Sequence, residues 1–139
     1  MKKLAGMICA ATLCLSAVAM YSTESVPTGP IIVARRAFKN QTGNIPVTTL
    51  FTPAKGGTYR ISVYYDTASN PDTPTLTGYY TDDFASYQAQ IVLSGNENGT
   101  AESESGQLLI EDVAGTPIQL GAVTNGQGTY NLYVIVEQI

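Results

Sequence analysis

Three stretches of the chain alternate strictly between apolar and polar positions. The apolar sets are Tyr59, Ile61, Val63 and Tyr65, then Tyr87, Ala89, Ile91 and Leu93, and finally Tyr130, Leu132, Val134 and Val136. Successive side chains of a β-strand point to opposite faces, so each stretch predicts a strand with one buried face and one wetter face.

Five weaker apolar segments complete the set, at 31–38, 47–51, 75–80, 107–113 and 117–123. No stretch after residue 30 has a helical period. Gly, Pro, Asn and Asp interrupt the chain roughly every eight to twelve residues, which is typical of short strands joined by turns. We therefore predict an all-β fold, a single β-sandwich of jelly-roll type with about eight strands in two antiparallel sheets of four.

The N-terminus has the composition of an export signal. Lys2 and Lys3 precede an apolar stretch, and Ala17-Val18-Ala19 supplies small residues for cleavage. The apolar run is shorter than the roughly 20 residues that a membrane span needs. We predict a signal peptide at 1–19, a flexible leader at 20–30 and the jelly-roll domain at 31–139. The expected location is secreted, extracellular or periplasmic, with no membrane contact after cleavage.

Cysteine and histidine usage restricts the chemistry. Both cysteines, Cys9 and Cys14, lie within the predicted signal, and the chain has no histidine. The mature domain therefore has no disulfide and depends on burial of a core. Ser-His-Asp and Cys-His catalytic arrangements and the usual zinc sites are excluded.

Charge is distributed unevenly along the chain. Removing Lys2 and Lys3 leaves five basic residues against eleven acidic ones, a net charge of −6, and the five cations are Arg35, Arg36, Lys39, Lys55 and Arg60. Nucleic acid and anionic membranes are poor partners for such a chain. Two explanations stay open: the early strands neutralise later ones across the sheet, or a basic patch on one subunit meets an acidic patch on the next.

Carboxylates are the remaining candidates for chemistry. Glycosidases use paired carboxylates, and Asp82-Asp83, Glu102, Glu104 and Glu111-Asp112 are available. Carboxylates on loops and outward strand faces are ordinarily solvated, so we expect no enzyme activity. The turn at 96–100, with Glu102 and Glu104 nearby, offers oxygen ligands for calcium but lacks the spacing of a calcium loop. We therefore expect no cofactor, with calcium as the alternative.

Tyrosine is the other candidate for binding, because the chain has nine tyrosines and no tryptophan. Tyr64-Tyr65 and Tyr79-Tyr80 lie in predicted strands, so one ring of each pair faces the core and the other faces outward. Exposed tyrosines stack on sugars or form contact surfaces between subunits. The candidate surface residues are Tyr64, Tyr79, Tyr80, Asp82 and Asp83.

Residues 51–64 (FTPAKGGTYRISVY) resemble the corresponding stretch of C1q/TNF-like jelly rolls. Residues 40–51 (NQTGNIPVTTLF) and 130–137 (YNLYVIVE) are similar to short jelly-roll proteins of bacteria and phage virions. This resemblance implies a jelly roll that often trimerises and binds through its outer surface. It transfers no functional residue, because these families share packing positions.

These observations favour a secreted, non-enzymatic binding or structural module. We expect a homo-oligomer, such as a trimer, that acts through outer loops at one end, chiefly 67–86 and 94–106. One alternative is a carbohydrate-binding module that recognises a glycan or a cell-surface partner through Tyr64, Tyr79 or Tyr80. The other is a subunit of a surface filament or adhesin, in which the leader and strand 31–38 pair with a neighbour's open sheet edge.

Overall fold

The computed structural model describes residues 29–67, 73–96, 102–124 and 128–139, which form nine strands and no helix. The strands are β1 (Ile31–Gln41), β2 (Ile45–Phe51), β3 (Gly57–Thr67), β4 (Thr75–Thr81), β5 (Ser86–Ile91), β6 (Ser94–Asn96), β7 (Glu102–Asp112), β8 (Ile118–Val123) and β9 (Tyr130–Gln138). Among these residues, no helix reaches the length and hydrophobicity that a membrane crossing requires.

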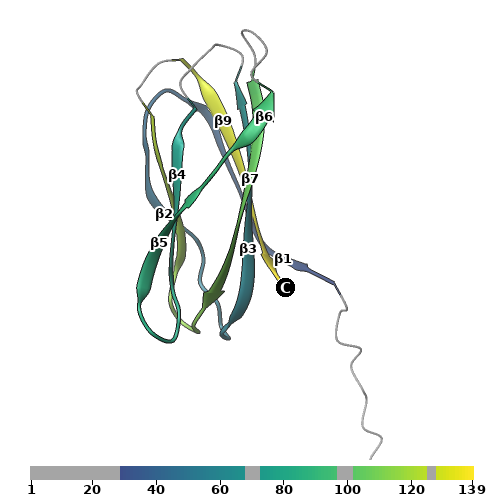
Figure 1. Cartoon of the computed structure of the whole chain (residues 1–139), viewed down its shortest axis with the longest axis vertical. Helices are drawn as coiled ribbons and strands as arrows, with labels where there is room; N and C mark the ends of the chain where they lie inside the picture. Colours follow the sequence, from purple (N-terminus) through teal and green to yellow (C-terminus); the bar gives the residue numbers. More distant parts are fainter. Residues whose placement is uncertain (1–28, 68–72, 97–101, 125–127) are drawn as a thin grey trace, which may run out of the picture.

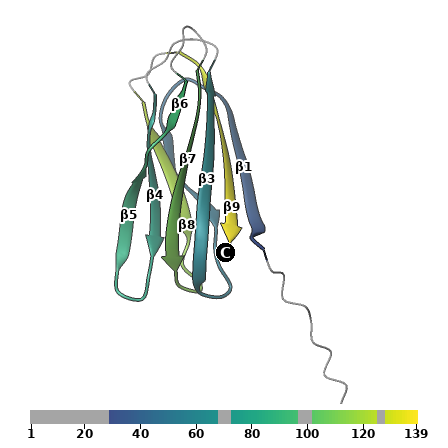
Figure 2. The same ribbon diagram turned by 45° about the vertical axis from the view of Figure 1, so that its right-hand side comes forward.

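The strands form two facing antiparallel sheets, ordered β1-β9-β3-β7-β6 and β2-β8-β4-β5 (Figures 1 and 2). The pairing is nested: β1 pairs with β9, β2 with β8, β3 with β7 and β4 with β5. Such nesting arises when one long hairpin winds around itself, which is the jelly-roll arrangement. The predicted all-β jelly-roll sandwich is confirmed.

The core lies between the two sheets and follows the alternation of the sequence. The inward residues of β3 and β9 are at most 3 % exposed; they are Tyr59, Ile61, Val63, Tyr65, Tyr130, Leu132, Val134 and Val136. Leu76, Ile91, Ile110, Ile118 and Leu120 contribute from the other strands. The two strongest alternating stretches therefore predicted both the strand and its buried face.

The structure has one short strand more than the about eight that the sequence suggested, so the two sheets contain five and four strands. The stretch 87–94 does not stay in one sheet: β5 ends at Ile91, and Ser94–Asn96 pairs with β7 in the opposite sheet as β6. The sequence predicted a turn there. Strand β7 begins at Glu102, before the predicted start at 107, so its first residues offer an edge to which β6 bonds.

Gly106 lies where the chain between β5 and β6 passes over β7 (Figure 1). A Cβ atom placed on Gly106 would lie 2.5 Å from the backbone carbonyl oxygen of Val92 and 2.8 Å from Cγ2 of Ile91. Glycine is therefore required at this position because the two chain segments touch.

Two carboxylates lie in the interior, against the expectation that acidic residues would be solvated. Glu104 and Asp112 are 5 % and 3 % exposed, respectively. Both occupy β7 positions whose side chains alternate inward, together with Gly106 and Ile110. The early start of β7 places Glu104 within the strand, which the predicted start at 107 did not include.

The predicted signal peptide and most of the predicted leader, residues 1–28, lie outside the described residues. So does most of the turn at 96–100 that was considered for calcium. The described chain includes Gly29 and Pro30 and then enters β1, which is an edge strand of the five-stranded sheet.

Candidate functional site

The three candidate tyrosines lie on three different surfaces. Tyr64 is on the outer face of the five-stranded sheet, where its ring centroid is 6.2 Å from that of Tyr133. Tyr80 packs against the core and stacks on Tyr87, at 5.6 Å between centroids. Tyr79, its neighbour in β4, alternates to the outer face of the four-stranded sheet. These rings do not form a single platform.

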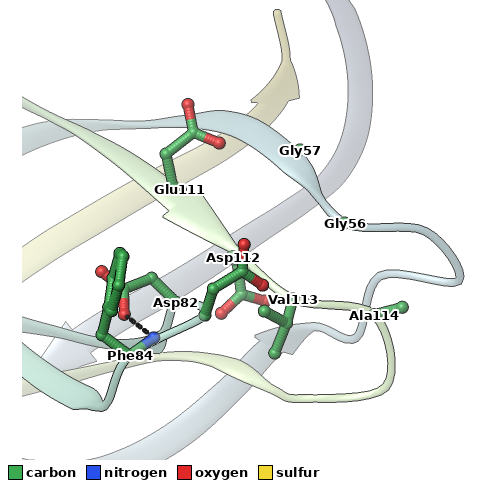
Figure 3. A pocket seen from close by; sticks show the side chains of 9 residues that line it. Gly56, Gly57, Asp82, Phe84, Glu111, Asp112, Val113 and Ala114 are labelled. Carbon is green, nitrogen blue, oxygen red and sulfur yellow. Dashed lines mark hydrogen bonds between the residues drawn. The ribbon is translucent and has the colours of Figure 1, made fainter.

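Asp82 and Asp83 lie in the hairpin that joins β4 to β5. The Oδ1 atom of Asp82 accepts hydrogen bonds from the backbone N–H groups of Phe84 (2.8 Å) and Ala85 (3.0 Å) (Figure 3). The N–H of Asp82 donates to the Ala85 carbonyl at 3.1 Å. Asp82 therefore shapes the hairpin, as aspartate commonly does in turns. Asp83 is exposed, and Phe84 is 90 % exposed.

A pocket of about 590 Å³ lies beside this hairpin, at the end of the sandwich where β7 finishes (Figure 3). Its lining carries four carboxylates, from Asp82, Asp83, Glu111 and Asp112, together with Phe84 and the backbone of Gly56 and Gly57. Glu111 is exposed and accepts a hydrogen bond from the Thr58 hydroxyl. The pocket is strongly acidic.

Asp112 links the two sheets at this end. Its Oδ1 atom accepts a 2.8 Å hydrogen bond from the Thr81 N–H, and the Thr116 hydroxyl lies 3.2 Å from both carboxylate oxygens. The Val113 N–H returns a 2.8 Å hydrogen bond to the Thr81 carbonyl. Burial raises the pKa of Asp112 above its ordinary value, while the hydrogen bonds from Thr81 and Thr116 oppose that rise.

We expect Asp112 to give the fold a pH-dependent stability. The folded protein holds the Asp112 proton more tightly than the unfolded chain, so this contribution is complete below the ordinary value of 3.8 and is lost as pH rises through the raised pKa. Asp112→Asn keeps an oxygen that accepts from Thr81 but cannot ionise.

Urea unfolding of both proteins between about pH 4 and about pH 7 measures this effect. The difference in unfolding free energy between wild type and Asp112→Asn should shift with rising pH in favour of the variant. A difference that stays constant over this range would show that Asp112 titrates alike in the folded and unfolded chains.

A carboxyl group with a raised pKa beside other carboxylates is also what acid–base catalysts use. Here, however, Oδ1 of Asp112 accepts from the Thr81 N–H, the Thr116 hydroxyl lies 3.2 Å from both carboxylate oxygens, and the residue is 3 % exposed. Among the described residues, no group of three or more acidic, cysteine or histidine side chains is arranged to hold a metal ion.

The opposite edge of the molecule is basic. Arg35, Arg36 and Lys39 are exposed along β1, the first strand of the five-stranded sheet. The ion pair between Arg60 and Glu137, at 2.8 Å, is the one found within the described parts of the chain. Neutralisation across the sheet therefore accounts for one cation, and the three on β1 have no acidic partner among the described residues.

A second pocket, of about 440 Å³, lies at this basic edge. It is lined by Arg35, Arg36, Ala37, Tyr133, Val134 and Ile135. Its lining is mainly apolar, apart from the two arginines. The sequence suggested a basic patch but not this pocket, because the pocket forms only when β1 pairs with β9.

The two segments predicted to act together, 67–86 and 94–106, meet at one end of the sandwich, but the hairpin within the first of them lies at the other end. Thr67 pairs with Glu102 at one end, and Gly57 pairs with Asp112 at the other. The hairpin at 82–85 lies at the second end, beside Val113. The segment 67–86 thus spans the whole length of the molecule, since it contains all of β4.

The chain was compared with protein families, curated proteins and solved structures. No family model matches the chain, and no curated protein matches it. The solved structures that are similar include two pentameric capsid proteins isolated from metagenomic phage sequences. The first is 15 % identical with a TM-score of 0.41, over 99 % of this chain and 81 % of the other. The second is 14 % identical with a TM-score of 0.41, over 97 % and 81 %.

Proposed function

We propose that this chain is a secreted, non-enzymatic structural or binding module that assembles with further copies of itself. The observation that carries the proposal is the separation of charge between the β1 edge and the end of the sandwich where β7 finishes. Arg35, Arg36 and Lys39 lie along the β1 edge, and the carboxylate-lined pocket lies beside β4, β5 and β7. In the five-stranded sheet β9 and β3 separate β1 from β7, and in the facing sheet β4 and β5 lie away from the β2 edge (Figures 1 and 2).

The basic β1 edge and the acidic pocket can neutralise each other when they belong to two different copies. The β1 edge of one subunit is attracted to the acidic side of another, because opposite patches steer association and set its orientation. Two β1 edges brought together would place like charges opposite each other, which disfavours symmetric edge-to-edge pairing. The contact is therefore head to tail.

A head-to-tail contact gives a ring if the rotation between copies closes and a filament if it does not. The trimer implied by the C1q/TNF-like resemblance is one closed form. The filament or adhesin subunit is the open form of the same contact. Both follow from a single interface, and the rotation between copies decides between them.

Two observations support this function over its alternatives. Asp112, the carboxyl group whose pKa is raised by burial, is engaged by Thr81 and Thr116, so it serves the fold rather than a reaction. A sugar platform needs several aromatic rings on one surface, whereas Tyr64, Tyr79 and Tyr80 lie on three. The geometry therefore favours assembly over catalysis or glycan binding.

Sedimentation of the mature domain tests the proposal. We expect an oligomer at about 0.05 M salt that weakens at about 0.5 M, because salt screens exposed charges. Lys39→Glu should weaken assembly, and Lys55→Glu, the same charge change off β1, should not. A domain that stays monomeric at the highest soluble concentration would contradict the proposal, as would an oligomer equally stable in Lys39→Glu.

A further inference from the structure

Phe84 is the most exposed large apolar residue of the described chain, at 90 %, and it stands next to two carboxylates at the tip of the β4–β5 hairpin. The pocket between β1 and β9 combines an apolar lining with two arginines. We propose that the hairpin of one copy inserts Phe84 into the β1–β9 pocket of the next copy, with the Asp83 carboxylate meeting Arg35, which pairs with Ile135 on the outer face of the sheet. This inference rests on the proposed self-assembly and specifies its interface.

The hairpin is held in shape before any contact. Asp82 fixes the turn through its hydrogen bonds to Phe84 and Ala85. At the base of the hairpin, the Tyr80 and Tyr87 rings stack across the two strands at 5.6 Å between centroids. A projecting group held in this way loses little conformational freedom on binding, which favours affinity. An exposed aromatic ring on a rigid support is typical of an interface anchor.

The pocket is suited to an aromatic ring. Ala37 lies opposite Tyr133 in the β1–β9 pairing, and its small side chain leaves space beside the larger residue. Tyr133 and Ile135 provide apolar surface, and the nearby arginines offer positive charge to the face of a phenyl ring. Burying a side chain of this kind removes about 150–250 Å² from water.

Charge gives the contact its direction. Arg35 and Arg36 are exposed at the pocket, and Asp83 is exposed beside Phe84. Arginine and carboxylate make strong, directional hydrogen-bonded pairs. The hairpin belongs to the far edge of the four-stranded sheet, and the pocket to the β1 edge of the other sheet, so a copy does not fill its own pocket. A second copy is the occupant that supplies both the ring and the carboxylates.

Phe84→Ser tests the apolar part of the contact. Wild type should sediment as an oligomer, and Phe84→Ser should assemble at least about tenfold more weakly, as expected for a central aromatic anchor. The variant should keep its circular dichroism and melting temperature, because Phe84 is 90 % exposed. Val123→Ser, at a 62 % exposed site, is the matched control and should assemble as wild type does. Wild-type assembly in Phe84→Ser would overturn the inference.

Charge reversal tests the polar part. Asp83→Arg and Arg35→Asp should each weaken assembly, and the double variant should restore it, because the pair is then re-formed with its signs exchanged. A double variant weaker than both single variants would contradict the pairing. The two proposals fail separately: a monomeric wild type rejects self-assembly, whereas an oligomeric wild type with an equally oligomeric Phe84→Ser rejects this interface alone.

Discussion

Gly106→Ala is expected to lower the free energy of unfolding by about 3 kcal/mol, near the upper end of the cost of overpacking a core. The new Cβ would lie 2.5 Å from the Val92 carbonyl oxygen, and that atom is backbone. A crowded side-chain end can rotate away, but the carbonyl moves only if the crossing between β5 and β6 moves with it. The expected damage is therefore a shift of the strand that carries the hairpin at 82–85.

Two other glycines provide controls for this substitution. Gly43 has no atom within 4 Å of its ideal Cβ, so Gly43→Ala should change the free energy of unfolding by less than about 0.5 kcal/mol. Gly78 is crowded by Cδ2 of Leu108 at 2.7 Å, the end of a flexible side chain, so Gly78→Ala should cost less than Gly106→Ala. Urea unfolding followed by circular dichroism ranks the three. A Gly106→Ala protein as stable as Gly43→Ala would show that β5 and β6 do not cross over β7 in this way.

The fold was predictable from sequence to the extent that it depends on local pattern. Tyr59 to Tyr65 and Tyr130 to Val136 alternate with period 2, and both runs bury the predicted face. The run from Tyr87 to Leu93 alternates equally well, yet β5 ends at Ile91 and the chain joins the other sheet from Ser94. Alternation shows which side chains share a face, but it does not show which strand a segment pairs with.

The candidate site was also predictable only where it depends on local sequence. Asp82 and Asp83 were identified as a pair of adjacent carboxylates, and they line the acidic pocket. Phe84 follows them directly, and an aromatic residue within a polar turn was a signal that was not used. The β1–β9 pocket was beyond reach, because it joins Ala37 to Tyr133 across most of the chain. Only the pairing of the first strand with the last creates it.

Two variants, one without a working hairpin and one without a working pocket, are expected to form a defined dimer when they are mixed. Phe84→Ser leaves the pocket intact, and Arg35→Asp combined with Arg36→Asp leaves the hairpin intact. Each variant alone should be monomeric, since every head-to-tail contact needs one of each surface. Mixed together, the intact hairpin of one variant can enter the intact pocket of the other, and no surface is left for a third copy.

Native mass spectrometry of the equimolar mixture is the most direct test that copies of this chain join through two different surfaces. The account predicts a one-to-one dimer of the two variants, with no larger species, under conditions in which each variant alone is monomeric. A mixture that stays monomeric, or one that rebuilds assemblies of wild-type size, would contradict it.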